Sequence, residues 1–146
     1  MGTRANIVIQ DRYNNKVILY HHNDGYWDRG IGYQLHLLCL SGLLIRQTYA
    51  EDVANILIKG DFSSAVEKLN KPEELETIDK NYQLTKYIHG DIEYLYNIDM
   101  GKETTLTCRQ GRCEWDKGKQ DNVFLAEKVE HIVKYRLKQP VYGMQM

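Results

Sequence analysis

The sequence predicts an α+β fold in which an antiparallel sheet, built from an N-terminal hairpin and a later β-meander, is covered by a buried central helix and a C-terminal helix. Three observations favour it: two β-like runs precede a leucine-rich stretch, three more follow it, and a helical pattern closes the chain. A chain of 146 residues buries roughly 70% of its unfolded surface, and no long linker divides it. We therefore expect a single domain over residues 1–146.

The N-terminal hairpin is predicted from two short runs, residues 6–10 (NIVIQ) and residues 16–20 (KVILY). Both are rich in the β-branched and aliphatic residues typical of strands. The intervening residues 11–15 (DRYNN) contain paired asparagines, which tolerate positive φ. This combination predicts an antiparallel pair joined by a tight turn.

Two helices are expected next. Leucines occupy nearly every side of a helix drawn over residues 33–47, so this helix should be central and buried. Thr48 and Glu51 form a capping-box pattern for a second helix over residues 49–59, and Gly60 is placed to end it.

The middle of the chain is more polar. Residues 63–70 predict a short third helix, and the acidic residues 72–81 indicate a surface connection. Three β-like runs then cover residues 83–89, 93–99 and 104–108. They predict the meander that completes the sheet.

The C-terminal part is expected to end in a helix. Residues 112–115 extend the sheet through a turn at residues 110–111. From residue 121 the pattern becomes helical, and Pro140 is placed to end the helix. The apolar face of this predicted helix consists of Leu125, Val129, Ile132, Val133 and Leu137.

Composition limits the partners. Nineteen basic and twenty acidic residues give a formal charge of −1, so no general field attracts nucleic-acid polymers or anionic membranes. The longest apolar run, residues 35–45, is interrupted by polar residues and is far short of the ~20 residues of a bilayer span. No signal-peptide pattern is present, and an odd count of three cysteines fits reduced thiols. We expect a cytoplasmic protein with no DNA, RNA or membrane partner.

The densest chemical pattern is residues 20–32, YHHNDGYWDRGIG, just before the leucine-rich run. Planar rings can stack on bases, arginine can hold phosphate oxygens bidentately, and polar side chains can read base edges. The pattern therefore predicts a ligand cradle, with a simple Asp-Gly turn as the competing interpretation. The predicted ligand-binding residues are Arg4 and Arg29 for phosphate, Tyr26, Trp27 and Tyr33 for rings, and His21, His22 and Asp24 for polar edges.

Metal binding and catalysis are less well supported. His21 and His22 are adjacent on a strand, so their side chains point to opposite faces and cannot share one ion. Cys108 and Cys113, expected to face each other across a tight hairpin, lack the second pair of a zinc site. Neither a Walker A sequence nor a complete dinucleotide fingerprint is present. We expect no metal and no cofactor, while a small hydrolase or transferase using His21 or His22 with Asp24 stays open as an alternative.

Three segments carry a family resemblance. The start MGTR, the segment YHHNDGY at residues 20–26 and the tyrosine-rich run DIEYLY at residues 91–96 resemble small phage and bacterial proteins that begin MGTR and carry H-x-D-G-Y. Their usual form is H-W-D-G-Y, whereas this chain has Asn23 in the second position. If that tryptophan stacks on a ligand, Trp27 would have to replace it here.

In size and setting the chain is also similar to phage immune-evasion sponges, homo-oligomers that sequester cyclic nucleotide signals of bacterial defence systems without degrading them. This resemblance implies a non-enzymatic phage protein that binds a cyclic nucleotide, blocks host antiphage defence and forms a homo-oligomer. A further alternative is a protein that inhibits a host factor through exposed tyrosines of the sheet, namely Tyr87, Tyr94 and Tyr96.

Overall fold

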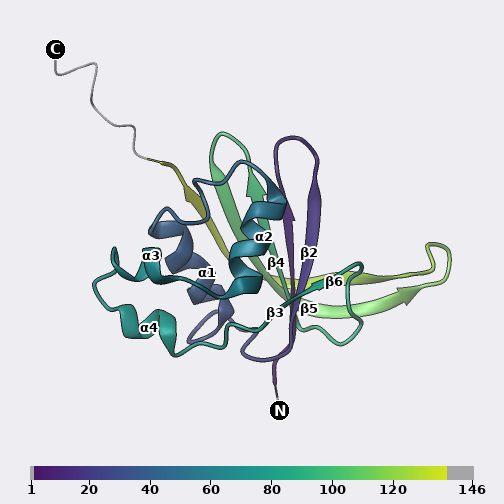
Figure 1. The fold of residues 1–146 in the computed structure, drawn as a ribbon. Coiled ribbons are helices and arrows are strands. Elements are labelled where there is room, and N and C mark those ends of the chain that lie inside the picture. Colours follow the sequence, from purple (N-terminus) through teal and green to yellow (C-terminus); the bar gives the residue numbers. More distant parts are fainter. Residues whose placement is uncertain (1, 138–146) are drawn as a thin grey trace.

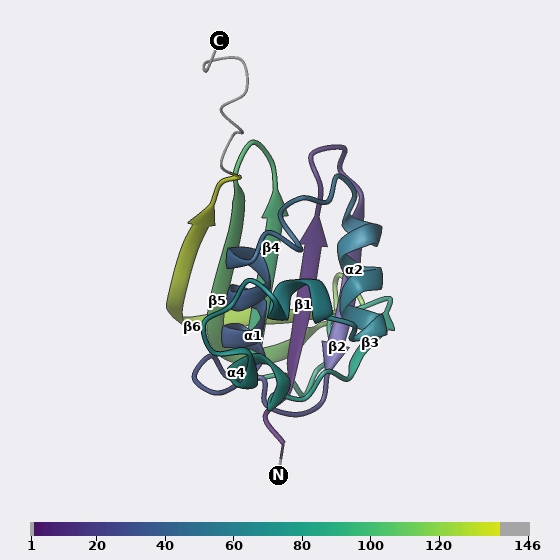
Figure 2. The ribbon, with the colours of Figure 1, turned by 60° about the vertical axis from the view of Figure 1, so that its left-hand side comes forward.

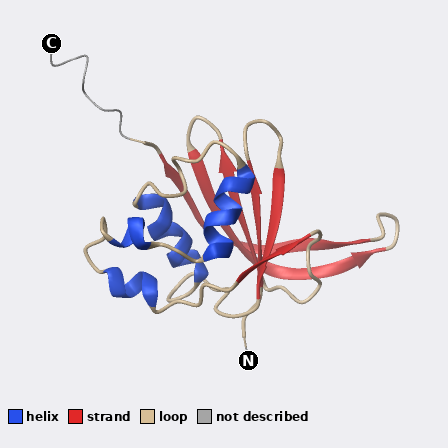
Figure 3. Ribbon diagram, in the orientation of Figure 1, coloured by secondary structure: helices blue, strands red, loops and turns tan. Residues whose placement is uncertain are grey.

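The computed structural model describes residues 2–137, which form one sheet with helices on one of its faces (Figure 1). Figure 3 shows the same two layers by secondary structure. The elements are β1 Ala5–Gln10, β2 Lys16–His21, α1 Ile31–Leu40, α2 Ala50–Lys59, α3 Ser63–Val66, α4 Pro72–Glu76, β3 Tyr82–Thr85, β4 Tyr94–Met100, β5 Thr104–Asp116 and β6 Asp121–Tyr135. The predicted α+β class is confirmed.

The sheet is mixed, so the prediction of a purely antiparallel sheet is wrong. Its six strands have the order β3-β2-β1-β4-β5-β6, and β1 runs parallel to β4 while the other neighbours are antiparallel. The cause is the connection from β3 to β4. It crosses the sheet face opposite the helices, where the His89 N–H donates to Asn6 Oδ1 at 2.8 Å, and this return starts β4 beside the start of β1.

The N-terminal hairpin forms as predicted. β1 and β2 pair antiparallel, and Asn14 in the turn takes a φ of 66°. The carboxylate of Asp11 accepts hydrogen bonds from the N–H groups of Tyr13 at 2.9 Å and Asn15 at 3.1 Å. This side chain therefore holds the turn that sets the register of β1 and β2.

The second helix is capped differently from the prediction. Asp11 Oδ2 also accepts a hydrogen bond from the Ala50 N–H at 2.8 Å, so the hairpin turn caps α2. The predicted Thr48–Glu51 capping box is wrong, because the N-cap residue makes no side-chain cap bond. The other end is confirmed, since Gly60 ends α2 in the left-handed conformation with a φ of 68°.

The other helices differ from the prediction in length or in position. α1 ends at Leu40 instead of residue 47. The chain turns immediately after it, at Ser41 and Gly42, and Gly42 has a φ of 89°. α3 stops at Val66, and α4 forms inside the segment predicted as a plain connection. Figure 2 shows α1, α2 and α4 in front of the strands. Among residues 2–137, no helix has the length and apolar character needed to cross a bilayer.

The predicted C-terminal helix is wrong, because residues 121–135 form β6 at the edge of the sheet. Leu125, Val129 and Ile132, assigned to a buried helix face, are 38%, 48% and 61% exposed. The side chains that face the core are His131, Val133 and Tyr135, at alternating positions, and of these only Val133 was on the predicted face. The proposed stop at Pro140 lies outside the described residues.

β5 runs without a break from Thr104 to Asp116, so the predicted turn at residues 110–111 is wrong. These residues lie at a bulge, and the hairpin turns only after Asp116. Cys108 and Cys113 consequently lie on one strand and do not face each other; both are free thiols.

The core lies between the sheet and the helices. Its largest fully buried side chains include Ile7, Leu35 and Tyr96. Tyr94 and Tyr96 are 9% and 0% exposed, which corrects the expectation that they form an exposed surface; Tyr87 is 53% exposed.

Candidate functional site

The segment 20–33 leads from the end of β2 into α1, and its centre is a tight turn. The Gly25 N–H donates to the Thr3 carbonyl at 2.8 Å, and the Tyr96 hydroxyl donates to the Gly25 carbonyl at 2.6 Å. A Cβ on residue 25 would lie 2.8 Å from the Thr3 oxygen, so only glycine fits. Asp24 has a φ of 55°, and its Oδ1 accepts the hydroxyl of Tyr26 at 3.0 Å. Asp24 and Tyr26 thus bond to each other within the turn.

The two histidines diverge as predicted: His21 is fully buried, whereas His22 is exposed. The ring of His21 lies edge-on to Tyr82, with centroids 4.7 Å apart. Its Nδ1 faces the Asn23 carbonyl and its Nε2 lies 3.1 Å from the Asp79 carbonyl. Burial lowers the pKa of His21 despite these two acceptors. Burial thus favours the neutral form of His21, which has one ring N–H to donate to these carbonyls and so fastens the loop before β3.

His22 belongs to a polar cluster that also contains Arg4, Tyr20 and Asp91. Arg4 Nε lies 3.3 Å from His22 Nδ1 and 3.1 Å from Asp91 Oδ2. The Tyr20 hydroxyl donates to Asp91 Oδ2 at 3.0 Å and lies 3.2 Å from His22 Nδ1. Burial and the bond to Asp91 raise the pKa of Tyr20 to about 12. Two predicted residues, Arg4 and His22, therefore meet at the exposed end of the sheet.

A stack of three rings continues from this cluster. His89 lies between Tyr20 and Tyr87, with centroid distances of 4.0 Å and 4.8 Å. Neither His89 nor Asp91 is among the predicted site residues, because residues 83–89 predict only a strand and Asp91 lies between that strand and the next. The neighbouring tyrosines were the available signal.

Trp27 is part of the hydrophobic core. It is 7% exposed, and its ring stacks on His131 of β6 with centroids 3.9 Å apart and planes inclined by 21°. A Cβ on Gly32 would lie 2.7 Å from the Trp27 ring, so the indole packs tightly against the start of α1. The ring therefore has little surface left for a ligand.

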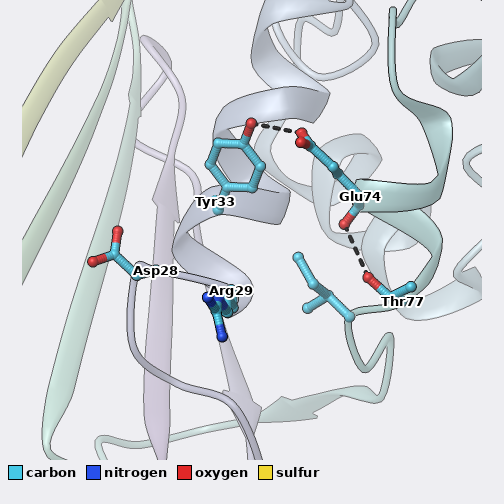
Figure 4. Close-up of a pocket in the computed structure, with 6 residues that line it drawn as sticks. Asp28, Arg29, Tyr33, Glu74 and Thr77 are labelled. Atoms are coloured by element: carbon cyan, nitrogen blue, oxygen red, sulfur yellow. Dashed lines mark hydrogen bonds between the residues drawn. The ribbon is translucent and has the colours of Figure 1, made fainter.

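Arg29 and Tyr33 come together at a cavity of about 710 Å³ between the start of α1 and the end of α4. Figure 4 shows Tyr33 pointing from α1 toward Glu74 on α4, with Asp28 and Arg29 on the loop that leads into α1. The Tyr33 hydroxyl donates to Glu74 Oε2 at 2.8 Å. This bond, followed by burial, raises the pKa of Tyr33. The cavity lining is completed by Thr77 and Ile78.

A second cavity lies on the other side of Tyr33. This hollow of about 450 Å³ shares Tyr33 and Glu74 with the first and is lined on its far side by Lys68, Lys71 and apolar side chains. The bond between Tyr33 and Glu74 therefore separates two adjoining hollows on the helical side of the molecule. Sequence reasoning missed Glu74, since nothing in residues 72–81 indicated that they would pack beside α1.

The polar and titratable groups in and near the cavity define what chemistry is available there. Among residues 2–137, no group of three or more His, Cys, Asp or Glu side chains is placed to hold a metal ion. Burial raises the pKa of Cys39 to about 12, which makes it an unreactive core thiol. At the cavity the Thr77 hydroxyl donates to the Glu74 carbonyl at 3.4 Å. What the cavity does provide is a ring, a guanidinium and two carboxylates.

The eight predicted residues thus fall into three places. Arg4 and His22 lie in the polar cluster, Arg29 and Tyr33 at the cavity, and His21, Asp24, Tyr26 and Trp27 in the turn and core between them. Comparison of the chain with protein-family models, with curated proteins and with solved structures gives no match.

Proposed function

We propose that the protein binds and sequesters a cyclic nucleotide without transforming it, in the cavity beside Tyr33. The observation that carries this proposal is that one cavity of about 710 Å³ joins a guanidinium, from Arg29, and an accessible ring, from Tyr33. Pockets for small ligands commonly measure about 300 to 1,000 Å³. A cyclic dinucleotide is of a size that such a space holds.

The charges of the cavity favour a ligand with few negative charges. Arg29 can bond a phosphate bidentately, while Asp28 and Glu74 repel further anionic groups. A cyclic phosphodiester carries one charge per phosphate, whereas a terminal phosphate of a linear nucleotide carries up to two. The ring of Tyr33 would stack on a base, a contact worth roughly 1–3 kcal/mol. Low charge density and planar bases together describe a cyclic nucleotide.

In a phage setting, such binding would remove an immune signal and so block host antiphage defence, and the protein would act as a homo-oligomer in the host cytoplasm. The support for this setting is the resemblance of the MGTR start and the segment 20–26 to phage proteins. Sequestration needs affinity and no catalysis.

The test is to incubate the purified protein with a panel of cyclic di- and trinucleotides, measure binding by calorimetry, and then heat the complex and identify what is released. We expect one or more nucleotides to bind and to be recovered intact. Arg29→Ala should weaken binding, whereas Arg12→Ala, an exposed arginine in the β1–β2 turn, should not. Recovery of cleaved product would overturn sequestration, and a panel without any binding would overturn the nucleotide ligand.

A second candidate function is a small hydrolase or transferase, and the polar cluster around His22 favours it. The carboxylate of this cluster is Asp91, which contacts Arg4 and Tyr20, and not the expected Asp24, which bonds Tyr26. His22 could then act as a base while Arg4 holds an anionic substrate. In that case His22→Ala should abolish turnover and leave substrate binding nearly unchanged; binding of intact ligand by an unreactive wild type would rule it out.

A further inference from the structure

The two carboxylates of the cavity have hydrogen-bonding capacity that the protein leaves unused. Glu74 Oε2 accepts the Tyr33 hydroxyl, while among residues 2–137 no side chain donates to Glu74 Oε1 or to the Asp28 carboxylate. An ionised carboxylate accepts several hydrogen bonds. These oxygens are therefore available to a ligand in the cavity that presents N–H or O–H donors.

The bond from Tyr33 also fixes where the free oxygen lies. A glutamate on a short surface helix would ordinarily sample several rotamers. Because the Tyr33 hydroxyl holds Oε2 at 2.8 Å, Glu74 is oriented beside the ring that would stack on a base. The base plane and the acceptor are thus positioned by the same side chain.

The common bases differ in how they match such an acceptor. Guanine presents two neighbouring donors, N1–H and the N2 amino group, on one edge. Adenine and cytosine place a ring-nitrogen acceptor beside their amino group, and uracil flanks its single N–H with two carbonyl oxygens. A carboxylate attracts the two donors of guanine and repels the acceptors of the other bases.

We infer that the cavity selects a guanine base, with the Glu74 carboxylate accepting from its N1–H and N2 amino groups while Tyr33 stacks on the ring and Arg29 holds the phosphate. This inference rests on the proposed binding of a cyclic nucleotide and names the base that the site reads. Asp28, on the loop side of the cavity, is available to a second donor such as a ribose hydroxyl.

The experiment compares three cyclic dinucleotides, one with two guanines, one with guanine and adenine, and one with two adenines, by calorimetry. We expect the guanine-containing ligands to bind about 10- to 100-fold more tightly than the adenine-only one. Glu74→Gln should remove most of that preference, because its amide presents one acceptor and one donor. The adenine-only ligand should bind the variant at least as tightly as it binds the wild type, because an amide no longer repels the ring-nitrogen acceptor and can donate to it.

Glu73→Gln is the matched control, since Glu73 is the exposed neighbour on α4 and does not line the cavity. It should keep the guanine preference. The amide oxygen introduced by Glu74→Gln can still accept the Tyr33 hydroxyl, and an unchanged melting temperature would show that the fold is intact. Equal binding of all three dinucleotides, or a preference that survives Glu74→Gln, would overturn the guanine inference while leaving nucleotide binding in place. Failure of all three to bind would overturn both.

Discussion

Residues 20–27 and residues 28–33 form one aromatic and charged segment in the sequence, yet they do opposite things in the structure. Most of the first half is used by the fold, since His21 is fully buried and Trp27 is 7% exposed, and only His22 and Asn23 are exposed. The second half leaves Asp28 and Arg29 exposed and places Tyr33 at a cavity. The difference shows that a chemically rich stretch need not be one site, because neighbouring residues such as Trp27 and Asp28 lie in different surroundings, one in the core and one at the surface.

The strongest test of this division is Trp27→Ala. Removing a buried aromatic side chain leaves a cavity and typically costs about 3–5 kcal/mol. We expect the free energy of unfolding in urea to fall by that amount, since the indole packs on His131 and against Gly32. Trp27→Phe should cost much less because it keeps a ring in place. A Trp27→Ala protein of normal stability that has lost its ligand would mean that Trp27 belongs to the binding surface after all.

Arg29→Gly should act in the opposite direction on stability. Arg29 has a φ of 58°, and this left-handed conformation costs a residue with a Cβ about 1–2 kcal/mol. Glycine removes that strain, partly offset by its freedom in the unfolded chain, so stability should rise by up to about 1 kcal/mol. Nucleotide affinity should fall roughly tenfold or more, because a hydrogen bond to a charged group is worth about 1.5–3 kcal/mol.

Gln120→Gly is the control for this variant. Gln120 has a φ of 53° in the β5–β6 turn, far along the chain from the cavity. It should gain similar stability and leave nucleotide affinity unchanged. Loss of stability in Arg29→Gly would instead show that the Arg29 side chain supports the fold, and the division between the two halves would fail.

The pH dependence of stability tests the first half further. Burial lowers the pKa of His21 below the value of about 6.5 for an exposed histidine, so the unfolded chain binds the proton more readily. Stability should therefore fall as the pH drops below about 6.5, by at most about 1.4 kcal/mol per pH unit. Urea unfolding between pH 7.5 and 5 measures this loss of stability. The range lies above the pH at which most carboxylates titrate, so the histidines dominate the change.

Burial also lowers the pKa of His36, helped by the charge of His131, so the series should be repeated in His36→Asn to isolate His21. Rising stability at lower pH would mean that His21 is a cation in the folded protein, donating to both the Asn23 and Asp79 carbonyls.

Local chemistry explains which parts of the fold were predictable. The Asn14 turn and the Gly60 cap follow from conformations that few other residues adopt, and the aliphatic residues of β1 and β2 mark strands plainly. The sequence of β6 predicts a helix and not a strand because only one of its core-facing residues, Val133, is aliphatic, so the alternation of a strand is hidden. Its two register shifts opposite β5 further break the alternation, so the exposed apolar residues imitate a helical period.

The candidate site was predictable only in part, for a different reason. Arg29 and Tyr33 carry a visible signal, a cation and a ring beside a glycine-containing turn. Glu74 reaches Tyr33 from a distant part of the chain, and Asp91 reaches Arg4 in the same way. Such contacts depend on how helices and strands pack, which no short-range pattern contains.

The smallest expected effect separates the ring of Tyr33 from its hydroxyl. Tyr33→Phe keeps the stacking face and loses only the bond to Glu74, so stability should change by less than about 1 kcal/mol. Nucleotide affinity should fall by less than tenfold, with the loss concentrated in guanine-containing ligands because Glu74 is no longer oriented. Tyr33→Ala also removes the stacking face, worth about 1–3 kcal/mol, and should weaken every cyclic nucleotide that binds. If both variants bind nucleotide like the wild type, Tyr33 does not contact the ligand and only separates the two cavities. Tyr33 would then have a structural role, as Trp27 does in the first half of the segment.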